Sequence, residues 1–213
     1  MSLAKLWRQP ATSPVQIDSR ALDQLFREAR THNGWRPIDV PDALLEEAVE
    51  LAKMGPTSAN VSPLRIVFVR SSEAKLRLKG TLAPGNVDKT MAAPVTAILA
   101  HDTKFYDLLP RLFPHADAKA WFVGNEAFAN DTAYKNGTLQ VAYFILALRA
   151  VGLDTGLMSG FDNASVNAEF SPGGQIKSNQ IKSNVLVNIG YGDPAKLFPR
   201  NPRLEFPEIA TYV

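Results

Sequence analysis

One segment near the middle of the chain constrains the fold most: a long stretch of helical periodicity that is apolar on most of its circumference. It runs from about Asp131 to Val151, and Gly152 follows as a natural helix end. A helix of this kind is buried, so other elements must surround it. A second segment, Ala93 to Ala100, is almost wholly apolar and partly β-branched, which predicts a central buried strand.

The rest of the chain alternates few strands with many helices, which predicts an α+β fold in layers. Its 213 residues suit a single domain from Asp18 to Val213, preceded by a proline-containing extended arm over residues 1–17. Helices are expected over 18–30, 41–55, 72–82, 104–113, 116–130 and 163–170. Further strands are expected over 64–69 and 185–190, a glycine-rich segment over 152–160, and an extended tail from 198 that ends in a strand or turn.

Composition and charge exclude several classes of function. A net charge of +2 is too small for the basic footprint of a nucleic-acid-binding protein. The longest apolar run ends at Arg149, well short of the ~20 residues that cross a bilayer, and the first residues lack the apolar core of a signal peptide. The absence of cysteine fits a reducing cytoplasm, where we expect the protein to reside.

Common catalytic motifs are also missing. The three histidines lie far apart in sequence, without neighbours at metal-ligand spacing, so no metal site is expected. The sequence contains no P-loop, no GxSxG nucleophile motif and no GxGxxG dinucleotide motif.

Four short segments remain as candidates for binding a ligand. Arg30 with His32, and Arg200 with Arg203, could clamp one phosphate if the two ends of the chain converge. The segment of Pro56, Thr57, Ser58 and Asn60 offers hydroxyl and amide groups to a ring edge or a polyol. The segment 156–160, which ends in Ser159 and Gly160, would let backbone N–H groups approach a planar ligand. Taken singly, each set is better explained by solvated arginines or ordinary turns.

A perfect tandem repeat, QIKSN at 175–179 and again at 180–184, is too short to be a solenoid unit. We interpret it as a local duplication that lengthens the loop before the last core strand.

The order of several motifs along the chain resembles that of the flavin-dependent nitroreductase family. These motifs are GPTSANVSPLRIVFV, APVTAILA, GLDTGLMSGFD, NIGYGD and the C-terminal RNPRLEF. The similarity is closest to the subgroup that contains the malonic semialdehyde reductase of pyrimidine degradation, through ARTHNGW, MGPTSAN, LDTGLMSGFD, KSN and NIGYGD.

This resemblance implies a three-layer fold with a mostly antiparallel sheet, and a homodimer with FMN at the subunit interface. It implies ping-pong hydride transfer from NADH or NADPH through flavin N5 to a small-molecule acceptor, without a catalytic acid or base. Carried over by position, the residues implied to bind the cofactor are Arg30, His32, Pro56, Thr57, Ser58, Asn60, Ser159, Gly160, Arg200 and Arg203.

The subgroup points to reduction of malonic semialdehyde to 3-hydroxypropanoate. Ser62 and Leu64 stand where the family commonly has Gln and Trp, which argues against classical nitroaromatic activity. Arg30, Arg65 and Arg111 are the candidates for holding a substrate carboxylate. The alternatives are a broad-specificity nitroreductase or quinone reductase, a flavin-binding protein without turnover and, last, a structural module without cofactor.

Overall fold

A four-stranded antiparallel sheet forms the middle layer of the protein in the computed structural model, which describes residues 15–170 and 180–213. The strands are β1 (Leu64–Val69), β2 (Val95–Asp102), β3 (Asp154–Met158) and β4 (Ile181–Gly190), in the order β1-β2-β4-β3. Every residue of β2 is buried, as expected for a central apolar strand. The expected α+β architecture with an antiparallel sheet is therefore confirmed.

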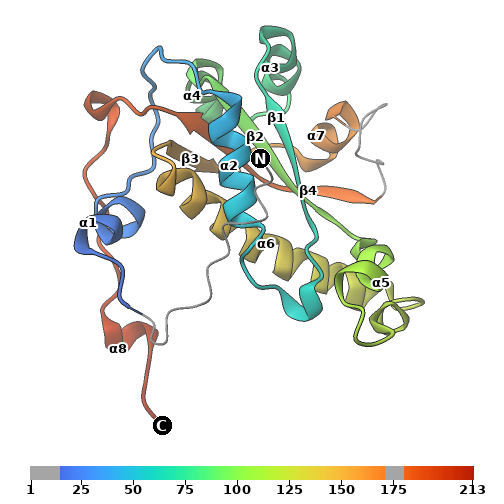
Figure 1. Ribbon diagram of the computed structural model, residues 1–213. Helices are drawn as coiled ribbons and strands as arrows, with labels where there is room; N and C mark the ends of the chain where they lie inside the picture. The colour runs from blue at the N-terminus through green and yellow to red at the C-terminus, as the bar shows by residue number, and fades with distance from the viewer. Residues whose placement is uncertain (1–14, 171–179) are drawn as a thin grey trace, which may run out of the picture.

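Helices cover both faces of this sheet (Figure 1). On one face, α2 (Asp42–Ala52) and the long α6 (Glu126–Ala150) pack against alternate residues of β2, such as Val95 and Ala97. On the other face, α3 (Ser72–Lys79) and α7 (Asn163–Phe170) pack against the intervening residues. The period-2 alternation of strand side chains thus divides β2 between two cores.

A smaller aromatic core is formed mainly by the segment that follows β2 and precedes α6 in the sequence. It contains the short helices η4 (Phe105–Leu108), α5 (Leu109–Leu112) and η5 (Ala118–Trp121). The single helix expected over 116–130 was wrong, because Gly124, with a φ of +80°, separates η5 from α6. The Asn125 side chain then caps α6, which starts earlier than the expected Asp131.

Four other expectations need correction. The expected helix over 18–30 is α1 (Ser19–Leu22) followed by a π-helical turn, η2 (Asp23–Arg27). The helix α4 (Pro84–Ala92), with Pro84 in its first turn, was not expected at all. The glycine-rich segment after α6 contains the strand β3, which was not expected, and the tail contains a short helix, α8 (Phe206–Ile209).

The tandem repeat falls partly outside the described residues. Its first copy, 175–179, lies outside the described residues, and of the second copy residues 181–184 belong to β4 and not to the expected loop. The expected arm over 1–17 lies outside the description except for residues 15–17, which have no regular structure.

The two ends of the described chain meet beside α6. Figure 1 shows α1 and the tail that follows β4 and η6 (Pro194–Lys196) running side by side on one flank, with α8 beyond the body of the molecule. In the described part of the chain, no helix combines the length and apolarity needed to span a bilayer.

Candidate functional site

Three arginines predicted from sequence converge on one cavity. Arg30, Arg200 and Arg203 all line a space of about 710 Å³ between the end of η2 and the tail. Backbone carbonyls hold them: Arg30 Nη2 donates to Phe198, Arg200 Nη2 donates to Ala29 at 3.3 Å, and Arg203 Nη1 donates within the tail. The condition set by the sequence, that the two ends of the chain converge, is met.

Two further arginines line the same cavity and were missed from the sequence. Arg27 lies in η2, where its Nε donates to Asp23 at 2.6 Å. Arg149 lies in the last turn of α6, and its Nη1 donates to the Leu25 carbonyl at 2.9 Å. Burial lowers the pKa of Arg149, and nearby Asp154 partly offsets this. The sequence signal for Arg149 was that a charged residue interrupts the most apolar predicted helix.

The lining of this cavity is cationic. It holds five arginine side chains and, among the described residues, no aspartate or glutamate. The other lining residues are Phe26, Ala29, Thr31, Asn33, Phe198, Pro199 and Asn201. Guanidinium groups that remain accessible around a hollow are typical of a phosphate or carboxylate site.

His32 is placed differently from Arg30. Its side chain is buried, and its Nε2 lies 3.4 Å from Asp154 Oδ1, whereas its neighbours Thr31 and Asn33 line the cavity. The His32 backbone N–H donates to Thr155 O at 3.0 Å, and Gly192 packs directly against the imidazole ring. His32 therefore fastens this loop to β3.

Asp154 completes this attachment. Burial alone would raise the pKa of Asp154, but hydrogen bonds from His32 and the Gly192 N–H, with the charge of Arg149, lower it overall. The loop next to the cavity is thus fixed by an ionised carboxylate at the start of β3.

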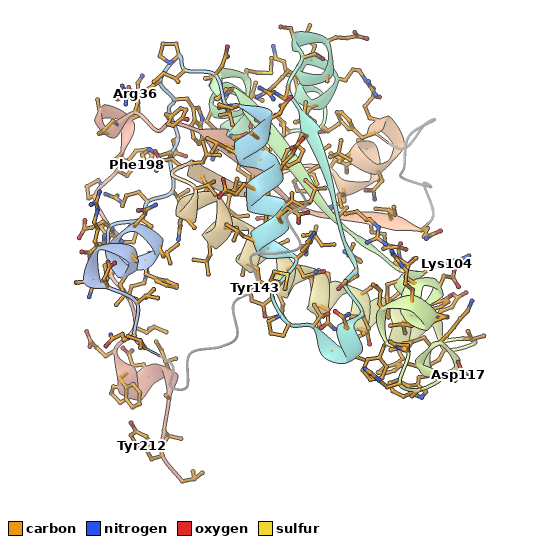
Figure 2. The ribbon with its side chains drawn as sticks, viewed as in Figure 1. Arg36, Lys104, Asp117, Tyr143, Phe198 and Tyr212 are labelled. Carbon is orange, nitrogen blue, oxygen red and sulfur yellow. The ribbon has the colours of Figure 1, made fainter. Side chains whose placement is uncertain are left out.

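The segment with Pro56, Thr57, Ser58 and Asn60 forms a tight loop between α2 and β1. The Ser58 N–H donates to Asn136 Oδ1 at 2.9 Å, and Asn60 Nδ2 donates to the Leu112 carbonyl at 2.8 Å. Tyr143, labelled in Figure 2, donates its hydroxyl hydrogen to the Pro56 carbonyl at 3.1 Å. Side chains from α6 and a carbonyl from α5 therefore hold the loop in place.

This loop is strained. The φ angles of Ala59, Asn60 and Ser62 are 46°, 53° and 41°, in the region that L-residues rarely adopt. Backbone strain of this kind is typical of functional loops held by their surroundings. None of the loop residues lines the arginine cavity, so a single chain does not bring these two predicted sets together.

Ser159 and Gly160 follow β3 at the edge of the sheet. The Gly160 carbonyl accepts hydrogen bonds from the Ala83 N–H at 3.0 Å and from Asn86 Nδ2 at 2.7 Å. A Cβ on Gly160 would lie 2.7 Å from that same Nδ2, so a larger residue would displace the Asn86 amide from this hydrogen bond. Within the described ranges no acceptor pairs with the N–H groups of Ser159 and Gly160, which leaves them free for a ligand.

Asn86 belongs to α4, a helix that was not expected, and so does Lys89 one turn later. Lys89 Nζ lies 3.5 Å from Asn33 Oδ1, and the Lys89 carbonyl accepts the indole N–H of Trp35 at 3.0 Å. Burial lowers the pKa of Lys89. The helix therefore bridges the Gly160 segment and the loop beside the arginines.

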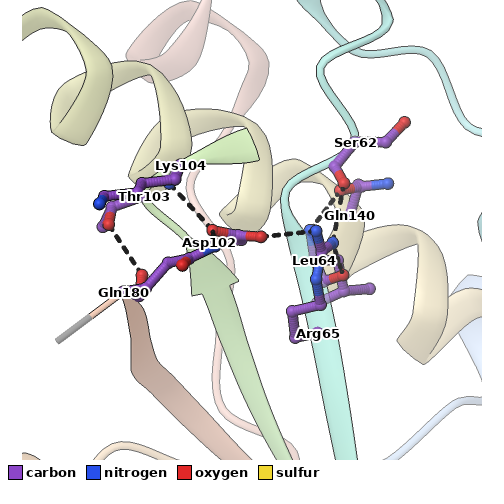
Figure 3. A network of polar contacts seen from close by, with 8 residues as sticks. All are labelled: Ser62, Leu64, Arg65, Asp102, Thr103, Lys104, Gln140 and Gln180. Carbon is purple, nitrogen blue, oxygen red and sulfur yellow. Dashed lines mark hydrogen bonds and ion pairs between the residues drawn. The ribbon is translucent and has the colours of Figure 1, made fainter. Parts of the chain in front are cut away.

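Arg65 and Arg111, suggested for a substrate carboxylate, lie outside the arginine cavity. Arg65 Nη2 donates to Asp102 Oδ2 at 2.7 Å, and Gln180 Nε2 donates to the other oxygen of that carboxylate at 2.8 Å (Figure 3). The charge of Arg65 is therefore already balanced. Gln180 opens the second copy of the tandem repeat, so part of that repeat has a structural role. Arg111 lies exposed on α5.

Comparison with known proteins agrees with this geometry. Residues 27–191 match the model of the nitroreductase family. A Burkholderia lata protein provisionally named NADH dehydrogenase/NAD(P)H nitroreductase is 59% identical over 194 residues, which cover 91% of this chain and 97% of that protein. A Ralstonia pickettii protein of the same name, HadB, is 57% identical, with 90% and 96% covered.

A solved structure shares the fold. A protein of Exiguobacterium sibiricum, provisionally named a nitroreductase and determined in complex with FMN, superposes with a TM-score of 0.79 at 18% identity, covering 95% of this chain and all of that chain. The family match spans both the arginine-bearing loop and the Gly160 segment. The chain belongs to the nitroreductase family.

Proposed function

We propose that this protein is an FMN-dependent NAD(P)H oxidoreductase whose arginine cavity binds the FMN phosphate. The observation that carries the proposal is the convergence of Arg30, Arg200 and Arg203 on a cavity without acidic lining among the described residues. A phosphate dianion matches such a site in charge and in the fork geometry of guanidinium groups. The related structure with bound FMN and the NAD(P)H names of the close relatives support this assignment.

The remaining groups suit the flavin ring. Ser159 and Gly160 offer backbone N–H groups, and Asn86 fixes their peptide through the Gly160 carbonyl. Lys89 adds a cation between that segment and Asn33. His32, buried against Asp154, acts indirectly by positioning the loop.

Bound FMN supplies hydride chemistry, accepting two electrons from NAD(P)H and passing them to an acceptor in a second half-reaction. The chain itself binds the phosphate, presents N–H donors and a lysine to the ring, and orients each substrate in turn. No side chain is required as a catalytic acid or base.

Without cysteine, the protein suits the cytoplasm, where its electron donor is found.

The complete site requires a homodimer. In one chain the loop of Pro56, Thr57, Ser58 and Asn60 does not line the arginine cavity, so we assign it to the cofactor of the partner subunit. The tail supports an extended interface, because apolar side chains such as Phe206 and Tyr212 are exposed along it, with Tyr212 at its tip (Figure 2). Light scattering should give twice the chain mass, and a monomer that binds FMN tightly would contradict the dimer.

The acceptor we favour is malonic semialdehyde, reduced to 3-hydroxypropanoate with NAD(P)H and one proton. This choice rests on the subgroup-like segments ARTHNGW, MGPTSAN and LDTGLMSGFD, and on Ser62 and Leu64 at the positions of the common Gln and Trp. The alternative is a broad-specificity nitroreductase or quinone reductase, which the names of the relatives favour. A flavin-binding protein without turnover is the second alternative.

An anaerobic acceptor assay separates these functions. The FMN-loaded protein is reduced with NADPH or NADH and then offered malonic semialdehyde, a quinone or a nitroaromatic compound in parallel. Rapid reoxidation by the aldehyde supports our choice. Reoxidation only by the other two acceptors moves the function to the alternative, and reduction by neither nicotinamide leaves a flavin-binding protein without turnover.

A further inference from the structure

Lys75 is a buried lysine without an acidic partner. It lies on α3 with 4% of its surface exposed, whereas Lys79 on the same helix is exposed. Lysine is almost never fully buried unless it is paired. None of the ion pairs in residues 15–170 and 180–213 involves Lys75.

Its ammonium group instead donates three hydrogen bonds. Lys75 Nζ lies 2.7 Å from the Thr90 carbonyl, 2.6 Å from the Ala93 carbonyl and 3.1 Å from Thr96 Oγ1. The Thr96 hydroxyl gives its own hydrogen to Asn188 Oδ1 at 2.8 Å, so it can only accept from Lys75. Three acceptors match the three donors of an ammonium group, and a neutral amine would supply only two.

These hydrogen bonds hold the C-terminal end of α4 in place. The Thr90 and Ala93 carbonyls lie where α4 ends, and carbonyls in the last turn of a helix lack the usual partner four residues on. Among the described residues, the Thr90 carbonyl accepts only the Ala93 N–H, at 3.3 Å, besides the ammonium of Lys75. A cation at a helix C-terminus is favoured by the helix dipole. Figure 1 shows α3 and α4 close together at the top of the molecule, as this contact requires.

The hydrogen bonds around Lys75 also connect to the segment of Ser159 and Gly160 through Met158, in addition to the connection through Asn86 of α4. Asn188 Nδ2 donates to Thr90 Oγ1 at 3.3 Å, and Thr90 Oγ1 lies 3.4 Å from the sulfur of Met158. Met158 is the last residue of β3 and directly precedes Ser159. The same buried cluster therefore supports both α4 and the strand that ends at the flavin ring.

We propose that Lys75 is a positioning residue of the flavin site, which it holds in place through α4. By anchoring the end of α4, its ammonium sets the positions of Asn86 and Lys89 and, through Asn86, the peptide of Gly160. The inference rests on the flavin site proposed above. It concerns the ring end of that site and not the phosphate end.

The test compares Lys75→Met with Lys79→Met, which removes the same charge from an exposed position of the same helix. Binding of FMN and of riboflavin, which lacks the phosphate, is measured by flavin fluorescence at a temperature where thermal melting shows both variants folded. Lys75→Met should weaken both ligands by the same factor, about tenfold or more, and shift the midpoint potential of the bound flavin. Lys79→Met should behave as wild type.

A second variant keeps the test decisive if Lys75→Met does not fold. Thr96→Val removes one of the three acceptors, together with the hydrogen bond that the Thr96 hydroxyl donates to Asn188, and leaves both carbonyls, so a smaller loss of the same kind is expected. Folded variants with wild-type affinities and potential would overturn the role of Lys75 alone. A wild-type protein that binds no flavin would overturn the proposed function and this inference together.

Discussion

Replacing Arg30 with glutamine tests the phosphate end of the site. Arg30 is half-buried, whereas Arg200 and Arg203 are exposed, so its charge is less screened by water than theirs. A hydrogen bond to a charged group contributes about 1.5–3 kcal/mol, which corresponds to roughly ten- to 150-fold in affinity. Because four other arginines remain at the cavity, we expect FMN affinity to fall by about ten- to 100-fold.

The assay is fluorescence titration of the apoprotein with FMN and with riboflavin. Arg30→Gln should weaken FMN binding and leave riboflavin binding almost unchanged, since only FMN carries the phosphate. The control is Arg20→Gln, which removes the same charge from an exposed position on α1, outside the cavity lining. Equal losses for both ligands, or no loss for FMN, would refute the assignment of this cavity to the phosphate.

Three further predictions concern the scaffold. Burial lowers the pKa of His101 to about 4, so the unfolded chain binds its proton more readily and stability falls as the pH drops from about 6.5 toward 4. In urea denaturation the wild type should lose about 2 kcal/mol more than His101→Phe between pH 7 and pH 5, and equal losses would contradict this cause. Gly192→Ala would place a methyl group inside the His32 ring and should cost about 1–3 kcal/mol, and an unchanged melting temperature would show that the loop can move aside. Asn136→Ala leaves the Ser58 N–H without its partner and should cost about 1–3 kcal/mol in the same assay, whereas a neutral result would mean that water replaces the amide.

Much of the fold was predictable because hydrophobic periodicity reports burial directly. The strand β1 matched its predicted bounds, β2 shifted by about two residues, and the helix over 163–170 was found as α7. The strand β3 was missed because Thr155 and Gly156 suggest a turn. Glycine is needed at position 156 because a Cβ there would lie 2.5 Å from the His32 carbonyl oxygen. This contact joins segments far apart in sequence, so a local pattern does not reveal it.

The candidate site likewise contains residues that were predicted from the sequence and residues that were missed. The convergence of Arg30 with Arg200 and Arg203 was foreseen as a condition on the chain ends, and the structure meets it. Arg149 was missed because it lies within a helix whose sequence pattern indicates only packing, and Lys89 was missed because no helix was expected over Pro84–Ala92. The buried position of His32 depends on Gly192 and Asp154, which local sequence does not connect.

The most direct test of the flavoenzyme assignment is the visible spectrum of the purified protein, loaded with FMN and held without oxygen. We predict one FMN per chain, bleaching on addition of NADPH or NADH, and return of the oxidised bands when malonic semialdehyde is added. Bleaching that persists until a quinone or nitroaromatic compound is added would change the acceptor only. A protein that takes up no FMN at saturating concentration would contradict the assignment of this chain as a flavoenzyme.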